Sequence, residues 1–541
     1  MTFLFRRSPD QQFPYRMAPN QHSPRRPGCF TWSQTAAAAA IAIVTVMAVL
    51  PQAQASESVG EQQRRDIPAG KRNVILMVSD GMGPQSVDMA RAFRKWQTGT
   101  ESVLYLDGHL IGQSRTRSSN SPITDSAAGA TAFSCGKKTY NGAIAVLPDH
   151  TPCGTVLEGA KAAGYKTGLV ATTRITDATP AVFAAHANSR SYEDLIAEQE
   201  IGEHHPLGRQ LDLLLGGGRC HFLPGSNGGC RDDNKDIIKL AKSKGFSYVG
   251  DRRGFDGLKG GAAAKLPLLG LFADNNIPFE IDRRYQNNVY PSLEEMTRTA
   301  LKALSDATRD SNQGFFIMIE GSRIDHAGHG NDPAAQVHEV VAFDRAFAAV
   351  LEFLEQGSTP GILISTSDHE TGGLSAGRAR PNILNSTSHS AEYLGEVLEN
   401  HGGDRTIARQ LVEEGLGIHD ASDREIDSVV RNGEKGFAEL ISQRAQVGWS
   451  TGGHTAVNVN IYASSREDAS ALIGTHENTE IGTFLAKYLR VDLNAITKRL
   501  EGIRTTPRRR AISDSSWMGK PLSAEELEEL KHRHGNYTTK A

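Results

Sequence analysis

Three short apolar runs, each leading into an acidic residue, constrain the fold of this chain more than any other feature of its sequence. The runs and the residues that follow them are 73–79 with Asp80, 315–319 with Glu320, and 361–367 with Asp368 and His369. Uninterrupted apolar runs of this length are typical of strands covered on both faces in a parallel sheet. Apolar residues at helical spacing occur over residues 293–304 and 334–354. We therefore expect an α/β fold with three layers, α/β/α, around a central, mostly parallel sheet.

The carboxyl ends of parallel strands meet at one edge of an open α/β sheet, so we expect the polar residues that follow these runs to gather there. The segment between His369 and Thr451 is long, polar and rich in glycine. Its weak apolar periodicity predicts a small inserted subdomain at about residues 371–449. Beyond Arg490 the chain is first basic and then acidic, which predicts an appended tail over residues 490–541.

Composition excludes several classes of protein. Apolar residues make up 38% of the 541 residues and charged residues 22%, which is the profile of a loop-rich globular protein and not of a disordered, fibrous or polytopic membrane protein. The 59 Lys and Arg residues face 62 Asp and Glu residues, a net charge of −3. There is no global basic field to bind nucleic acid or an anionic membrane, so an anionic substrate needs a local site.

The N-terminal region contains a long apolar run at residues 35–50, with five arginines and one acidic residue before it and Ala53-Gln54-Ala55 after it. This order is typical of an export signal, here cleaved after Ala55. An uncleaved membrane anchor is the alternative, although the run is short for a membrane span. We expect a signal peptide at residues 1–55, a polar linker at 56–72, and an exported protein, periplasmic or secreted. It keeps no stable membrane anchor if the signal is cleaved.

Four cysteines follow the signal, namely Cys135, Cys153, Cys220 and Cys230. An even number in an exported protein favours disulfides over metal thiolates, and the chain has no Cys-x-x-Cys spacing. Cys220 and Cys230 flank a glycine-rich loop, so we expect them to pair with each other. That leaves Cys135 to pair with Cys153, although the sequence alone is compatible with two other pairings.

Metal-binding residue types cluster after these predicted strands. Asp325 and His329 have the i, i+4 spacing that turns two side chains of a helix toward one ion. The other residues of this kind are Asp80, Glu320, His326, Asp368, His369 and His454. These residues fall into four groups along the sequence, around Asp80, Glu320 to His329, Asp368 with His369, and His454. Any one group alone is compatible with a solvated loop, but four groups at strand ends are not. Imidazole and carboxylate without thiolate suit Zn²⁺, whereas an all-oxygen set suits Mg²⁺, so two kinds of metal are indicated.

A candidate nucleophile lies in residues 124–132, where small, helix-compatible residues follow the pair Asp125-Ser126. Ser126 is expected at the N-terminus of a helix. The N–H groups and the positive end of the helix dipole there favour a bound phosphate and an ionised oxygen on the serine itself. The alternative is a plain helix cap.

Six motifs, in this order, resemble those of the alkaline phosphatase family. They are Asp80-Gly-Met-Gly, Thr124-Asp-Ser-Ala-Ala-Gly-Ala-Thr-Ala, Thr172-Thr-Arg-Ile-Thr-Asp-Ala-Thr-Pro, Glu320-Gly-x-x-Ile-Asp-His-x-x-His, Asp368-His-Glu-Thr-Gly-Gly and Gly453-His-Thr. The resemblance implies a catalytic domain at residues 73–489. It also implies hydrolysis of small phosphate monoesters to an alcohol and phosphate through a phosphoserine, with two Zn²⁺ ions and one Mg²⁺ ion, in a homodimer.

The resemblance also implies a role for each matching residue. Ser126 is the nucleophile, and Arg190 grips two phosphate oxygens. The ligand sets that it implies are Asp325, His329 and His454 for one zinc ion, Asp80, Asp368 and His369 for the second, and Asp80, Thr179 and Glu320 for magnesium.

Three further residues, Asp125, Asp177 and His326, are expected to support the ligands and the nucleophile. The family varies at two of these positions: some members have Asp with Lys, animal enzymes have His with His, and this chain has Asp177 with His326. Ala273 stands where animal enzymes have a calcium-binding glutamate, so we expect no such calcium site.

Two kinds of alternative function are compatible with parts of this pattern. A phosphodiesterase or sulfatase of the same superfamily is one, but the chain has no Cys/Ser-x-Pro-x-Arg signature of sulfatases. A metal-storage or phosphate-binding protein without turnover is the other. The pair of Ser126 and Arg190 argues against it, because storage needs no nucleophile.

Overall fold

The computed structural model describes residues 70–100, 104–502 and 515–533. The expected signal peptide (1–55) and most of the expected linker (56–72) lie outside these residues. Within the described part of the chain, no helix is long and apolar enough to cross a membrane.

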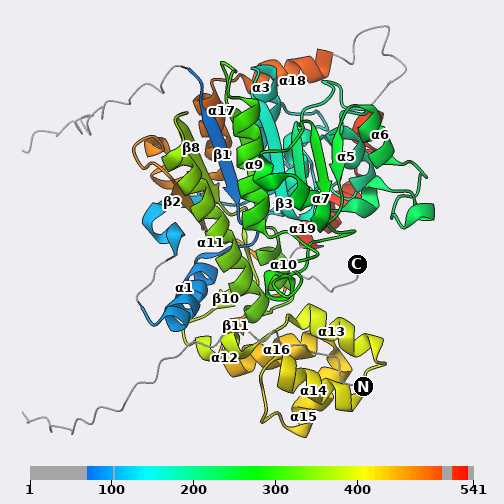
Figure 1. Ribbon diagram of the computed structural model, residues 1–541, viewed down its shortest axis with the longest axis vertical. Helices are drawn as coiled ribbons and strands as arrows, with labels where there is room; N and C mark the ends of the chain where they lie inside the picture. The colour runs from blue at the N-terminus through cyan, green and yellow to red at the C-terminus, as the bar shows by residue number, and fades with distance from the viewer. Residues whose placement is uncertain (1–69, 101–103, 503–514, 534–541) are drawn as a thin grey trace, which may run out of the picture. The chain divides into compact units, whose positions relative to one another are not determined.

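A ten-stranded sheet forms the centre of the fold (Figure 1). Across the sheet the strands are β14 (Gly474–Glu477), β2 (Leu110–Arg115), β13 (Val459–Ala463), β8 (Gly361–Thr366), β1 (Asn73–Val78), β7 (Phe315–Glu320), β3 (Lys166–Arg174), β4 (Leu213–Gly217), β6 (Leu268–Leu271) and β5 (Ser247–Val249). Only β13 runs antiparallel, to both β8 and β2, and the other neighbouring pairs are parallel. The expected mostly parallel sheet is confirmed.

Helices cover both faces of the sheet, which confirms the three layers (Figure 1). On one face, α1 (Pro84–Thr98) and α9 (Leu293–Ala307) pack against the long helix α11 (Pro333–Gln356). The other face is covered by α2 (Ser126–Cys135), α3 (Val156–Ala162), α4 (Ala178–Ala184) and α17 (Asn478–Leu489). Because both faces are covered, every residue of β1 and β7 is buried. Full burial is the physical reason for their unbroken apolar sequences.

The segment after β8 leaves the sheet and returns through two short antiparallel ladders. The outer ladder pairs β10 (Leu374–Ser375) with β11 (Gly448–Trp449), and the inner one pairs β9 (Glu370–Thr371) with β12 (His454–Thr455). The helices between them are α12 (Pro381–Ser386), α13 (Ala391–Asn400), α14 (Arg405–Gly415), α15 (Asp423–Asn432) and α16 (Glu434–Ala445), drawn in yellow tones in Figure 1. The inner ladder therefore brings His454 back beside the end of β8.

The remaining helices lie in connections and at the C-terminal end. They are α5 (Glu193–Glu200), α6 (Ile237–Ser243), α7 (Arg252–Gly257), α8 (Glu280–Arg283), α10 (Arg323–His329), α18 (Leu493–Gly502) and α19 (Ala524–Arg533). A short 3₁₀ turn, Ser515–Met518, precedes α19.

Candidate metal and phosphate site

Three acidic residues line up at one edge of the sheet. The central strand β1 pairs with β7 and β8, and the register places Val78 opposite both Glu320 and Thr366. Glu320 therefore ends β7, and Asp80 and Asp368 lie two residues beyond the paired ends of β1 and β8, at the same edge of the sheet. The turn after β1 needs glycine, because Gly81 has φ +76° and a Cβ there would lie 2.5 Å from the Cα of Asp325. Asp-Gly at this point thus permits α10 to approach the strand end.

A first group of ligands consists of Asp325, His329 and His454. The Nε2 of His329 lies 3.2 Å from Asp325 Oδ2 and 3.1 Å from His454 Nε2, and His454 Nε2 lies 3.5 Å from Asp325 Oδ1. Two donor atoms about 2.1 Å from one tetrahedral ion lie about 3.4 Å apart, so these separations suit a single Zn²⁺.

The outer nitrogens of the two imidazoles support the same assignment. His329 Nδ1 lies 2.7 Å from the carbonyl oxygen of Gly452, and His454 Nδ1 lies 2.8 Å from that of Thr124. Each Nδ1–H donates to its carbonyl, so in neutral rings the Nε2 lone pairs face each other. Two lone pairs 3.1 Å apart repel unless a cation lies between them.

A second group consists of Asp80, Asp368 and His369. Their donor atoms lie within 4.8 Å of one another, and His369 Nε2 is 3.1 Å from Asp368 Oδ2 and 3.5 Å from Asp80 Oδ1. His369 stacks on His454 with ring centroids 3.5 Å apart, so the two groups are adjacent. Asp80 Oδ1 and Asp368 Oδ2 are buried and accept no hydrogen bond. Such orphaned oxygens are explained if they coordinate a cation.

The oxygens of a third group come from Asp80, Thr179 and Glu320. Thr179, in α4, donates to Asp80 Oδ2 at 3.4 Å, and Glu320 Oε2 is buried without a hydrogen bond. Burial and the nearby Asp177 and Asp368 raise the pKa of Glu320 to about 8, against the hydrogen bonds that favour its ionised form. Burial and the neighbouring carboxylates raise the pKa of Asp80 well above its ordinary range. The protein's own cations therefore do not offset the charge of these carboxylates when they ionise, and an all-oxygen set of this kind fits Mg²⁺.

Ser126 lies beside the second group. It is the first residue of α2, it is buried, and its Oγ is 3.2 Å from His369 Nε2. Asp125 caps the helix by accepting from Ala128 N at 2.9 Å. The free N–H groups of the first turn and the dipole of α2 thus favour negative charge at this serine.

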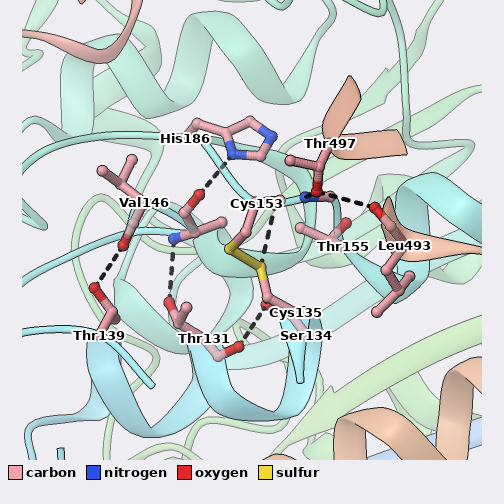
Figure 2. Close-up of a disulfide and its surroundings, with 12 residues drawn as sticks. Thr131, Ser134, Cys135, Thr139, Val146, Cys153, Thr155, His186, Leu493 and Thr497 are labelled. Atoms are coloured by element: carbon pink, nitrogen blue, oxygen red, sulfur yellow. Dashed lines mark hydrogen bonds between the residues drawn. A yellow bond between two sulfur atoms is a disulfide. The ribbon is translucent and has the colours of Figure 1, made fainter. Parts of the chain in front are cut away.

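A disulfide holds the other end of this helix. Figure 2 shows Cys135, the last residue of α2, bonded to Cys153, with Thr131 of the same helix bonded to the backbone nearby. The second disulfide joins Cys220 to Cys230. Both expected pairings are thus present, and the Cys135–Cys153 pair fixes the helix that carries Ser126.

Arg190 lies between two carboxylates at the margin of the site. It donates to Asp125 Oδ2 at 3.3 Å and to Asp177 Oδ1 at 2.9 Å. Asp177 also caps α4 and accepts from Arg174 at 2.9 Å. The sequence predicts Asp177 near the magnesium ligands. In the structure Asp177 also accepts a hydrogen bond from Arg190 and so orients its guanidinium. His326 is half-buried, and desolvation together with Arg323 lowers its pKa to about 4, so its ring is neutral at alkaline pH.

Two further residues of the site, Thr371 and Ser322, were not predicted from the sequence. Thr371 donates to Asp325 Oδ1 and contacts His369 Nδ1 at 3.2 Å, so it links the first two groups. Ser322 accepts from the backbone N–H groups of Thr172 and Thr173 and thereby ties α10 to β3. Thr371 lies in the same motif as Asp368 and His369, which is the signal that could have revealed it.

Comparison with known proteins agrees with this geometry. The family model described as alkaline phosphatase matches residues 71–491. The repressible alkaline phosphatase of Saccharomyces cerevisiae is 50% identical over 481 residues, covering 81% of this chain and 84% of that protein. The alkaline phosphatase of Thermus thermophilus superposes with a TM-score of 0.69 at 28% identity, covering 84% of this chain and 100% of that one. A variant of the TAB5 alkaline phosphatase with magnesium bound is 30% identical, with a TM-score of 0.54, covering 78% and 98% of the two chains.

Proposed function

This chain belongs to the alkaline phosphatase family, whose members are phosphomonoesterases, and we propose that it hydrolyses phosphate monoesters through a phosphoserine formed on Ser126. One observation carries the proposal. The Oγ of Ser126 lies at a helix N-terminus and 3.2 Å from His369 Nε2, inside a cluster of buried carboxylates and imidazoles that fits metal ions. A binding protein would not need a hydroxyl at that point.

We propose that the three groups bind two zinc ions and one magnesium ion. Asp325, His329 and His454 would hold one zinc ion. The second would be held by Asp80, Asp368 and His369, and Asp80, Thr179 and Glu320 would hold magnesium. When bound, such ions lower the pKa of an attacking hydroxyl and offset charge on the leaving oxygen. The magnesium-containing TAB5 structure supports a metal-dependent site in this family.

The protein's own side chains position the substrate. We propose that the Arg190 guanidinium binds two non-bridging oxygens of the phosphate, because a planar fork of donors fits them in pairs. Asp125 and Asp177 hold that guanidinium from one side and limit its freedom. Pre-orientation of this kind reduces the entropy lost on reaching the transition state.

The reaction has two displacements. In the first, the Ser126 hydroxyl loses its proton as Oγ forms a bond to phosphorus, the bond from phosphorus to the alkoxide breaks in line, and the alkoxide takes up a proton and leaves as the alcohol. In the second, the oxygen of water bonds to phosphorus, the Oγ–P bond breaks, a proton from the water returns to Ser126 Oγ, and inorganic phosphate leaves. The N–H groups at the start of α2 face the negative charge on the serine oxygen in both steps.

The direct test is an assay of the purified protein with p-nitrophenyl phosphate, bis-p-nitrophenyl phosphate and p-nitrophenyl sulfate. The proposal predicts the highest kcat/KM for the monoester and loss of turnover when a chelator removes the metals. A preference for the diester or the sulfate would instead favour the related phosphodiesterase or sulfatase function.

We also propose that the chain is exported, periplasmic or secreted, and forms a homodimer. Two disulfides support the export, because such bonds persist in oxidising compartments. N-terminal sequencing of the mature protein should give Ser56 as the first residue, and light scattering should give the mass of a dimer. A mature protein that keeps residues 1–55 would contradict the cleaved signal.

A further inference from the structure

Four consecutive residues of the C-terminal tail, 517–520, lie against the loop that carries Arg190. We call residues 517–520 the strap. They lie beyond residue 491, where the match to the family model ends. The loop comprises residues 186–192 and connects α4 to α5, and Figure 1 shows the red tail beside α5. The contact between the strap and this loop has no part in the proposed ligand sets.

Every backbone carbonyl of the strap accepts a hydrogen bond from this loop or from α5. Asn188 N donates to Met518 O at 2.8 Å, and Asn188 Nδ2 donates to Gly519 O at 2.9 Å. The Tyr192 hydroxyl donates to Lys520 O at 3.1 Å, and Gln199 Nε2 donates to Trp517 O at 2.8 Å. Four consecutive carbonyls with specific partners indicate a defined docking geometry, because each hydrogen bond restricts the backbone position of the next residue.

Packing reinforces these bonds. Trp517 is 6% exposed and Met518 is fully buried, in a small core with Val146. The indole of Trp517 meets the ring of His186 edge-on at 5.4 Å. Gly519 has φ +71°, and a Cβ there would lie 2.4 Å from the ring of Tyr192, so only glycine lets the strap lie flat on that ring.

The loop residues that the strap binds flank Arg190 on both sides. Asn188 precedes it by two residues and Tyr192 follows it by two. From the opposite side, Arg190 N donates to Gly142 O at 2.8 Å and the Tyr140 hydroxyl donates to Asn188 O at 2.9 Å. The backbone that positions the guanidinium is thus fixed between the strap and the 140–142 turn.

We propose that the strap is a positioning segment for Arg190, which it holds at the distance required to bind phosphate. This inference rests on the proposed function, because it assumes that Arg190 binds the substrate's phosphate. Displacement of a positioning group by about 1 Å can cost about 100-fold in rate, so a segment far from the chemistry can govern phosphate binding.

The test uses Gly519→Val, which pushes the strap off Tyr192, and Tyr192→Phe, which removes one hydroxyl without disturbing the fold. Glu525→Ala, on the exposed side of α19, is the matched control. We expect KM for p-nitrophenyl phosphate and the inhibition constant of inorganic phosphate to rise about tenfold in Gly519→Val, less in Tyr192→Phe, and not in the control. In an Arg190→Ala background, Gly519→Val should change neither value, because the strap acts through that arginine.

Hydrogen exchange gives a readout that does not depend on activity. Peptides that cover residues 186–192 should exchange faster in Gly519→Val and at the original rate in Glu525→Ala. Unchanged exchange in that loop would overturn the strap proposal whatever the protein hydrolyses. Equal effects of Gly519→Val with and without Arg190 would overturn it as well. A wild-type protein that releases no phosphate would refute the proposed function, and the exchange measurement would still decide the role of the strap.

Discussion

Removal of the Cys135–Cys153 disulfide should lower both stability and turnover. The bond closes a loop of 18 residues, which in the chain-entropy relation corresponds to about 3.2 kcal/mol of unfolding free energy. Unfolding entropy of about 2.1 cal/mol/K per residue gives roughly 1 kcal/mol/K for the mature chain, residues 56–541, so Tm should fall by about 3 °C in the double alanine variant. Since Ser126 lies at the other end of the same helix, kcat should fall about threefold.

The second disulfide provides the control for this prediction. Cys220–Cys230 closes a loop of 10 residues, which corresponds to about 2.7 kcal/mol of unfolding free energy. The Tm of its double alanine variant should therefore fall by nearly as much as that of the first variant. Neither of its cysteines belongs to α2, and kcat should stay at the wild-type value. Calorimetry and p-nitrophenyl phosphate kinetics on both variants check the reasoning. Equal losses of kcat in the two variants, or an unchanged Tm in the first, would refute it.

The metal ligands, the carboxylate that holds Arg190 and a buried histidine can each be tested by substitution. His454→Ala should bind about one zinc ion fewer per chain by elemental analysis, whereas Thr179→Ala should chiefly lose magnesium; equal losses of both metals would contradict the separate ligand sets. Asp177→Asn keeps an oxygen for the α4 cap but loses the charge that holds Arg190, so KM for the monoester should rise about threefold; an unchanged KM would show that Asp125 is sufficient. Burial, with Arg284 and Arg345, lowers the pKa of His338 from 6.5 to about 3, so His338 takes up a proton more readily in the unfolded state than in the folded state. The free energy of unfolding of the wild type should therefore fall by about 2 kcal/mol between pH 7 and pH 5 because of this ring. In urea unfolding, the free energy of unfolding of His338→Gln should fall by about 2 kcal/mol less than that of the wild type between pH 7 and pH 5. An identical pH dependence of the two proteins would contradict the lowered pKa of His338.

The ligand-bearing edge of the sheet could be predicted because its determinants are local in sequence. Asp80 and Asp368 each follow a strand and Glu320 ends one, and parallel strands in one sheet place their carboxyl ends together. Once the strand ends are aligned, the positions of these three acidic side chains are largely determined. The i, i+4 spacing of Asp325 and His329 is equally local, and the structure brings both side chains to the first group.

Other features depend on long-range contacts that no local pattern encodes. The pairing of Asp177 with Arg190 joins the ends of two different loops, and a charged residue on a loop has many possible partners. The strap joins residues more than 300 positions apart through backbone carbonyls, which every residue has. The antiparallel direction of β13 likewise depends on where the inserted segment returns to the sheet, and no periodicity reports that.

The most direct test of the central claim is to trap the covalent intermediate on Ser126. The zinc- and magnesium-loaded protein is mixed with a phosphate monoester, or with inorganic phosphate, and is quenched in acid. Mass spectrometry of the digest should find one phosphate on the peptide that begins the α2 helix, with fragment ions that assign it to Ser126, and none in Ser126→Ala. A protein that turns over the monoester without phosphate on Ser126, or a Ser126→Ala variant with wild-type turnover, would contradict the account.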